Sequence, residues 1–227
     1  FTNARSPSPS TVTTIISIFT GKYYSSLYWS AVDATPFKGM FKGAIMPHRD
    51  PSPRIAALLG MAGVKSVHVV PLWGLGRELG VGQGFSEELL TKRDYGHADE
   101  VMKLLIDRLE AQGGSPLFMY SHLVDPHAPY DLAGTHGTEY ERYLREMELV
   151  DRELAKLLQM IAAPDLAKRV ILIVSADHGE AFGEHGTQYH ALTLYEELVR
   201  VPLYVVLPGA EPRSIDGCAR KQTEEGF

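Results

Sequence analysis

Apolar residues along the chain fall either into short continuous runs or into the spacing of amphipathic helices. Continuous runs rich in β-branched and aromatic residues predict strands over 64–70, 117–123, 170–174 and 201–206. Apolar residues at helical spacing predict helices over 94–112 and 137–162, and shorter helices are expected over 53–62 and 194–198. Because the run at 170–174 is apolar at every position, we expect that strand to be buried.

The beginning of the chain allows two interpretations. A stretch rich in Ser and Pro at 6–10 is typical of a loop, and an apolar segment follows it and ends at Gly21. Ser10 or Thr11 would cap a helix that Gly21 terminates. The many β-branched residues of the segment fit a strand equally well, so both alternatives stay open.

Strands that alternate with helices in this order predict an α/β fold, with a largely parallel sheet sandwiched by helices. Ligands of such sheets gather at the carboxyl ends of the strands. The Gly-rich stretch 74–84 predicts a loop, residues 23–50 show no clear period, and the tail after Pro208 is polar and irregular.

Composition narrows the class of protein. Of 227 residues, 44% are hydrophobic and 22% charged, which excludes a disordered or fibrous chain. The one cysteine excludes an intrachain disulfide, and the formal net charge of −6 argues against a nucleic-acid partner. No apolar run approaches the roughly 18 to 20 residues that span a bilayer, and no signal peptide is visible. Because the chain begins with Phe1 rather than Met, we interpret the sequence as truncated.

Polar side chains gather after two of the predicted strands. His122, Asp125 and His127 follow the strand at 117–123, and Asp177 and His178 come directly after the strand at 170–174. Imidazole and carboxylate groups together are ligands for a divalent cation. The sequence therefore predicts a metal site at this edge of the sheet.

Other polar residues carry ordinary interpretations. Glu180 and Glu184, four residues apart, are typical of a solvated helix face. We expect the three isolated histidines to face solvent or to cap helices; these are His68, His97 and His136.

Several segments together resemble the sulfatase family, within the alkaline phosphatase superfamily. The segment 174–186, which contains Asp177-His178-Gly179, resembles the family's metal-binding motif, and 194–203 resembles its continuation. Residues 122–130 resemble the central Asp-Pro-His-x-Pro-Tyr element, and residues 8–21 resemble the helix that carries the nucleophile. A weaker glycine element matches at 80–85, and the elements keep the family's order over 1–208.

The resemblance implies roles for individual residues. Thr11, ten residues before Gly21, matches the nucleophile position, with Ser10 as the alternative nucleophile. It implies Asp177 and His178 as ligands of a divalent metal ion, which would be Ca, Mg, Mn or Zn. His127 and His190 match residues that bind the anionic group or protonate the leaving oxygen. The residues that the resemblance implies for substrate binding are His122, Asp125 and His185.

The nucleophile position departs from the sulfatase pattern. Sulfatases convert a Cys or Ser followed by Pro and Arg into formylglycine, whereas here Thr11 is followed by Val-Thr-Thr, so no formylglycine is expected. Phosphoryl-transferring relatives use an unmodified Thr. The resemblance thus implies a metal-dependent hydrolase of sulfuric esters. With Thr at the nucleophile position, the enzyme could instead act on phosphoric esters. At a helix N-terminus the hydroxyl would lie beside N–H donors that favour an anion.

Three alternatives to this interpretation remain. In the first, Thr11 only caps the helix and is not a nucleophile. In the second, the chain is a two-metal phosphodiesterase or phosphoglycerol transferase-like enzyme, with Asp125, His127 and His190 around a second ion. In the third, the chain is a catalytically inactive sulfatase-like domain that binds a partner or glycan.

The family's first strand, which ends in an Asp-Asp-like pair, has no match before Thr11. We therefore expect an incomplete catalytic domain over 1–208, an irregular tail over 209–227, weak metal binding and little turnover by this chain alone. The expected substrate is a small-molecule, glycan or lipid anionic ester. Periplasmic, extracytoplasmic and membrane-anchored parent proteins all fit the resemblance, and the oligomeric state stays open.

Overall fold

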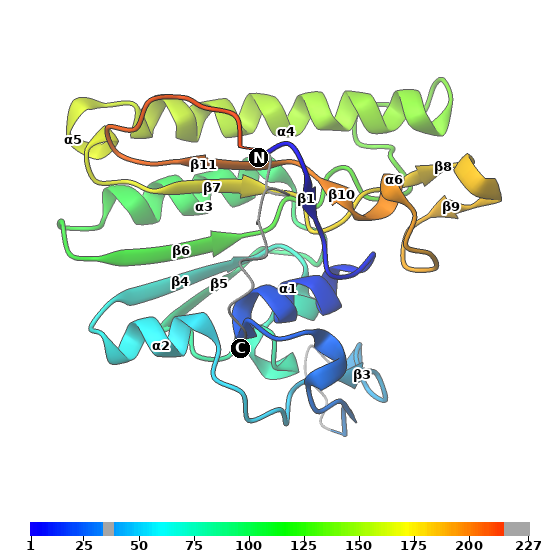
Figure 1. The fold of residues 1–227 in the computed structure, drawn as a ribbon, viewed down its shortest axis with the longest axis horizontal. Coiled ribbons are helices and arrows are strands. Elements are labelled where there is room, and N and C mark those ends of the chain that lie inside the picture. The colour runs from blue at the N-terminus through cyan, green and yellow to red at the C-terminus, as the bar shows by residue number, and fades with distance from the viewer. Residues whose placement is uncertain (34–38, 216–227) are drawn as a thin grey trace, which may run out of the picture. The chain divides into compact units, whose positions relative to one another are not determined.

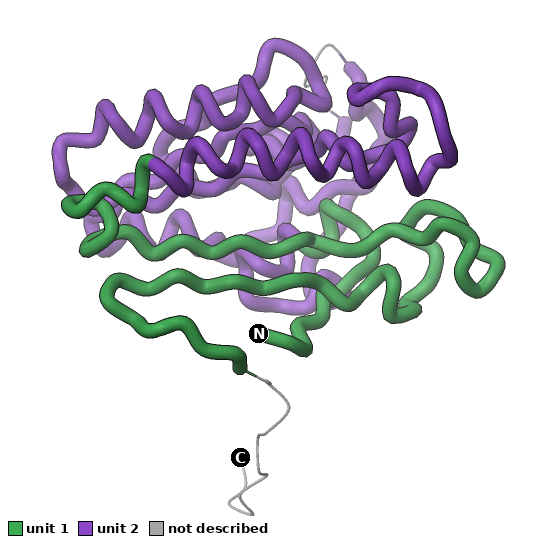
Figure 2. Tube along the Cα trace, turned by 90° about the horizontal axis from the view of Figure 1, so that it is seen from above, with its two compact units in different colours: residues 1–14, 160–227 green, residues 15–159 purple. Residues whose placement is uncertain are grey.

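A computed structural model describes residues 1–33 and 39–215, so the end of the expected tail lies outside the described residues (Figure 1). The chain divides into two compact units (Figure 2). The first unit comprises Phe1–Thr14 and Met160–Phe227, and the second comprises Ile15–Gln159.

The second unit is built on a three-stranded parallel sheet with the order β5-β4-β6 (Figure 1). Its strands are β4 (Lys65–Val70), β5 (Glu87–Leu90) and β6 (Leu117–Ser121). Its helices are most of α1 (Thr11–Thr20), α2 (Ile55–Met61), α3 (Ala98–Glu110) and most of α4 (Glu139–Ile161). The short strand β2 (Ser30–Ala31) pairs with β3 (Ile45–Met46). Short 3-10 helices lie at Tyr24–Ser26, Trp73–Leu75 and Arg77–Leu79, the last two within the expected glycine-rich loop.

Alternate residues of β4 face different partners. Val67 and Val69 pack into an apolar cluster with Val101 and other residues of α3. His68 points to the opposite face of the strand, where its ring meets that of Phe19 from α1 at a centroid distance of 6.1 Å. Helices thus pack on both faces of the parallel sheet, and the predicted α/β fold class is confirmed.

The buried environment of His68 corrects the expectation that this residue faces solvent. Its side chain is 0% exposed and lies among the rings of Phe85 and Tyr120, at centroid distances of 4.9 and 5.4 Å. Burial, with smaller contributions from His122 and Arg77, lowers the pKa of His68 from 6.5 to about 3. His68 is therefore a neutral core residue at physiological pH.

We predict that His68 makes folding sensitive to acid. Between pH 6.5 and about 3 the unfolded chain binds a proton at His68 that the folded chain does not, so stability falls as the pH falls through this window, by at most ~1.4 kcal/mol per pH unit. Urea unfolding at a series of pH values should show a shallower acid loss for His68→Leu than for the wild type. Equal slopes for the two proteins would show that His68 is not the group responsible.

The first unit consists of paired strands and short helices. β7 (Leu172–Ser175) pairs antiparallel with β11 (Leu203–Val206), and β1 (Ala4–Arg5) pairs with β10 (Arg200–Val201). The remaining elements are β8 (Ala181–Phe182), a 3-10 helix (Glu184–Gly186), β9 (Gln188–Tyr189), α5 (Pro164–Ala167) and α6 (Glu196–Val199). The strand expected over 201–206 is divided at Pro202, which has no N–H for a strand ladder.

The strand expected to be buried over 170–174 is partly exposed. Ile171 is 62% and Ile173 is 64% exposed, and Val205, which pairs with Ile173, is also exposed. In a two-stranded antiparallel sheet alternate residues lie on opposite faces, and this face is accessible in the described structure. A continuous apolar run does not reveal which face of a strand is covered, so the prediction of burial was wrong.

Residues 11–20 form a helix, α1 (Thr11–Thr20), rather than a strand. The backbone N–H of Thr14 donates to the carbonyl of Ser10 at 3.0 Å, which places Ser10 at the N-cap and Thr11 at the first helical position. Gly21, at φ +66°, ends the helix as expected.

Within the residues that the structure describes, no helix has the length and apolar character of a transmembrane span.

Candidate active site

The loop before α1 is held against the first turn of that helix. Thr13 Oγ1 donates to the carbonyl of Ser10 at 2.9 Å, and Thr14 Oγ1 donates to the carbonyl of Ser8 at 3.0 Å. The hydroxyls of Ser8 and Thr13 are also 2.5 Å apart. These bonds use the small hydroxyl residues of the Ser- and Thr-rich sequence to fix the position of Thr11.

The hydroxyl of Thr11 lies against His178, 167 residues later in the chain. Thr11 Oγ1 is 3.1 Å from His178 Nε2, and the same nitrogen is 3.2 Å from Asp177 Oδ2. His178 Nδ1 lies 2.8 Å from the carbonyl of Gly179. Because a carbonyl only accepts, Nδ1 donates this hydrogen bond, and Nε2 is the ring nitrogen that faces Thr11 and Asp177.

This arrangement fits part of a metal site. A hydroxyl oxygen and a carboxylate oxygen each lie within 3.2 Å of the same imidazole nitrogen. Three electron-rich atoms at such distances suit a divalent cation, for which oxygen and imidazole are common ligands. Among the described residues there is no group of three or more His, Cys, Asp or Glu side chains arranged to hold a metal ion. Asp177 and His178 would therefore supply two protein ligands.

His190 lies beside this pair. Its ring packs on that of His178, with centroids 4.3 Å apart and planes inclined by 32°. Its Nδ1 donates to Glu180 Oε1 at 3.0 Å, and this hydrogen bond raises the pKa of His190. The next backbone N–H, of Ala191, donates to the carbonyl of Pro9 at 2.9 Å, so the segment that carries His190 is bonded to the loop that precedes Thr11.

Glu180 was expected on a solvated helix face, and this expectation is wrong. No α-helix forms around it; the residue precedes the short strand β8, and its side chain is 7% exposed. Spacing of four residues alone could not show this, because it does not distinguish a helix face from two positions in a hairpin. The position of Glu180 directly after Asp177-His178-Gly179 is the one sequence signal that could have indicated a role in the site.

Gly179 is required by a close approach of two backbones. Its N–H donates to the carbonyl of Leu198 at 2.7 Å, and a Cβ at this position would lie 1.9 Å from the carbonyl oxygen of Glu197. Backbone atoms cannot move aside as a flexible side chain can. The glycine of the motif therefore allows α6 to pack against the strand end that carries Asp177 and His178.

We predict that Gly179→Ala destabilises the protein by about 1–3 kcal/mol, the usual cost of overpacking, and disturbs the neighbouring His178. Gly60→Ala is a matched control, because Gly60 lies in α2 and a Cβ there would have nothing within 4 Å. Thermal unfolding should show a loss for Gly179→Ala and none for Gly60→Ala. Equal melting temperatures for Gly179→Ala and the wild type would contradict the close approach.

His185 lies in the same unit but makes different contacts. Its ring stacks on Tyr195, with centroids 3.8 Å apart, and its Nδ1 donates to Glu197 Oε1 at 2.8 Å, which lowers the pKa of Glu197. The structure thus uses His185 to connect the turn after β8 with α6. Its implied role in substrate binding stays a prediction.

The other three predicted site residues lie in the second unit. Asp125 is 5% exposed and accepts the first N–H of α3 at 3.1 Å, and burial raises its pKa. The bond holds the loop that carries His127, whose ring also meets Tyr95 at a centroid distance of 5.2 Å. His122 Nδ1 is 3.3 Å from the Tyr120 hydroxyl. The geometry gives Asp125 a structural task, and the substrate contacts of all three residues stay predictions.

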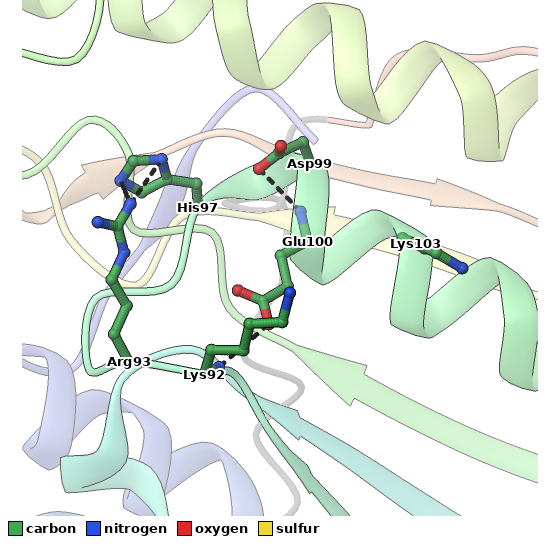
Figure 3. Close-up of a pocket in the computed structure, with 6 residues that line it drawn as sticks. All are labelled: Lys92, Arg93, His97, Asp99, Glu100 and Lys103. Carbon is green, nitrogen blue, oxygen red and sulfur yellow. Dashed lines mark hydrogen bonds between the residues drawn. The ribbon is translucent and has the colours of Figure 1, made fainter.

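A pocket of about 440 Å³ opens at the start of α3 (Figure 3). Side chains of both charge signs line it, and two of its carboxylates bind backbone N–H groups: Glu100 Oε1 accepts from Lys92 and Asp99 Oδ1 accepts from Glu100. The lining residues are Lys92, Arg93, His97, Asp99, Glu100 and Lys103. None of them is a predicted site residue, and none carries a hydroxyl or thiol nucleophile.

Comparison with known proteins gives a match over nearly the whole chain. A family model described as Sulfatase matches residues 1–226. No curated protein is similar enough in sequence to match the chain.

Several solved structures share the fold. The lipoteichoic acid synthase LtaP from Listeria monocytogenes has a TM-score of 0.68 and 13% identity, and the match covers 92% of this chain and 57% of LtaP. Ps i-CgsB in complex with a neocarrahexaose has a TM-score of 0.67 and 15% identity, and the match covers 92% of this chain and 58% of Ps i-CgsB. The periplasmic domain of the phosphoethanolamine transferase EptC from Campylobacter jejuni has a TM-score of 0.59 and 16% identity, and the match covers 90% of this chain and 67% of that domain. The chain thus spans about two thirds or less of the length of each.

Proposed function

We propose a function for this chain from one premise: it belongs to the sulfatase family. We infer that it forms catalytic machinery for the metal-dependent cleavage or transfer of an anionic ester, with Thr11 as the nucleophile. The observation that carries the proposal is the 3.1 Å contact between Thr11 Oγ1 and His178 Nε2 at the first position of α1. A residue that served only as a helix cap would not need this contact.

Each side chain of the cluster has a task in the proposed mechanism. Asp177 and His178 would hold the metal ion. When bound, such an ion lowers the pKa of a neighbouring hydroxyl and neutralises charge on the transferred group. The Thr11 hydroxyl loses its proton to solvent, and its Oγ attacks the phosphorus or sulfur atom as the ester oxygen leaves. The leaving oxygen takes the Nε2 proton of a doubly protonated His190, whose Nδ1–H stays bonded to Glu180. Water or an acceptor hydroxyl then releases the group from Thr11. The N–H groups at the N-terminus of α1 favour the anionic group throughout.

Two features favour a phosphoric over a sulfuric ester. Thr11 cannot supply the formylglycine of the sulfatases, and an unmodified hydroxyl is a suitable nucleophile for phosphoryl transfer. The similar proteins include a phosphoethanolamine transferase and a lipoteichoic acid synthase by name. Another similar structure was solved with a carrageenan oligosaccharide, so a glycan or lipid is the proposed carrier of the ester. The similar EptC domain is periplasmic, which supports an extracytoplasmic site of action for this protein.

A panel of aryl esters tests the proposed function. The full-length protein is assayed with aryl phosphate monoesters, aryl phosphate diesters and aryl sulfates, each with added Ca²⁺, Mg²⁺, Mn²⁺ or Zn²⁺. We expect cleavage of a phosphate ester that a chelator abolishes. Cleavage of sulfates alone would contradict the assignment to phosphoric esters. Absence of turnover in a folded, metal-loaded protein would favour a binding domain instead.

A further inference from the structure

We infer that Glu180 is a positioning residue whose buried carboxylate fixes the ring of His190, and the nitrogen that carries its proton, beside the Thr11–His178 pair. The inference rests on the proposed function, because that function makes His190 a group that acts in the reaction and therefore needs a defined orientation. It assigns a task to a carboxylate that was expected, from the sequence alone, on a solvated helix face.

The contact between the two side chains is short and protected. Glu180 Oε1 lies 3.0 Å from His190 Nδ1, and the side chains are 7% and 18% exposed. A carboxylate seldom occurs at such burial without a partner, because the loss of its hydration is unfavourable unless a hydrogen bond replaces it. The hydrogen bond to His190 is such a partner, so removal of either side chain affects the other.

The hydrogen bond also determines the tautomer of the imidazole. An ionised carboxylate only accepts hydrogen bonds, so Nδ1 of His190 carries a proton, and Nε2 is the nitrogen that exchanges a proton with the leaving oxygen. Packing on the ring of His178, at 4.3 Å and 32°, fixes the plane of the imidazole. The Ala191 N–H bond to Pro9 fixes the backbone. Plane, backbone and tautomer are therefore set by three separate contacts.

A second histidine–carboxylate pair in the same unit provides the matched control. His185 Nδ1 donates to Glu197 Oε1 at 2.8 Å, which is the same chemistry at a similar length. However, the His185 side chain is 51% exposed, so water can replace the carboxylate. Loss of Glu197 should therefore affect His185 without changing His190.

Nitrogen NMR of the histidine rings tests the tautomer directly. In the ¹⁵N-histidine-labelled full-length protein at alkaline pH, where the rings are neutral, we expect His190 to be protonated at Nδ1, its signals being identified by their loss in His190→Ala. Glu180→Gln keeps an acceptor and should keep this tautomer, whereas Glu180→Ala should shift it toward Nε2–H. Glu197→Ala should leave His190 unchanged. An unchanged His190 tautomer in folded Glu180→Ala would overturn the inference.

Turnover measurements test whether the position matters for the reaction. We expect Glu180→Ala to lower kcat by about 10- to 100-fold with little change in KM, the range for losing the carboxylate that orients a functional histidine. In a His190→Ala background the same change should have no further effect. Independent, additive losses would overturn the inference. If the full-length protein lacks turnover altogether, the proposed function fails, and the tautomer measurement still decides the role of Glu180.

Discussion

Thr11→Ala is expected to reduce kcat/KM of the full-length protein toward its phosphate ester by about a thousandfold or more. The side chain would lose the oxygen that forms the covalent bond, and enzymes without their nucleophile retain only the catalysis that binding and charge stabilisation provide. Thr11→Ser retains a hydroxyl at the first position of α1 and should retain most of the activity. Both variants are compared in steady-state assays with the metal ion added.

The controls for this prediction separate a nucleophile from a helix cap. Loss of a capping side chain costs about 1 kcal/mol of stability and leaves chemistry unaffected. Ser10→Ala removes the hydroxyl at the N-cap position and should therefore lower the melting temperature but not the activity. An active Thr11→Ala protein, or an inactive Ser10→Ala protein that remains folded, would reject Thr11 as the nucleophile.

Asp177→Asn is expected to abolish both metal binding and turnover. The amide has the same shape as the carboxylate but lacks its charge, and a cation bound beside His178 Nε2 and Thr11 Oγ1 would lose its negative ligand, the carboxylate whose Oδ2 lies 3.2 Å from His178 Nε2. Because loss of a mere supporting partner costs 10- to 100-fold in metal affinity, we expect a loss of at least about 100-fold here. Titration calorimetry and elemental analysis of the purified full-length protein measure the effect.

The control for this variant is another Asp of the same unit. Asp165→Asn removes an exposed carboxylate from α5 and changes the net charge by the same amount. It should retain both metal and activity. Normal metal content in Asp177→Asn would show that this carboxylate is not a ligand.

Local sequence patterns predicted the helices α3 and α4, in which apolar residues recur at helical spacing, and the strands β4 and β6, which are short and mostly apolar runs. Strand β5 was not predicted. Its sequence, Glu87–Leu90, contains two acidic residues in four positions, and its strand conformation depends on pairing with β4. Burial of His68 also depends on tertiary packing, which a single polar residue in an apolar run does not reveal.

The candidate site was predictable in part for a physical reason. Asp177-His178-Gly179 combines ligands with a glycine that only a close backbone contact requires, so chemistry and packing both leave a trace in the sequence. The contact of Thr11 with His178 joins residues 167 positions apart, and the family resemblance was the sole indication of it. For Glu180 the sequence offered only its position directly after this motif, since a buried and an exposed glutamate look alike in a sequence.

The most direct test of the central claim is to find the residue that carries the transferred group. The full-length protein is mixed with its phosphate ester and metal ion, quenched in acid during turnover, and digested for peptide mass spectrometry. The account predicts that the transferred phosphoryl group is attached to Thr11 and that Thr11→Ala carries none. Attachment to Ser10 or to any other residue, or turnover that leaves Thr11 unmodified under conditions where the covalent step is trapped, would contradict it.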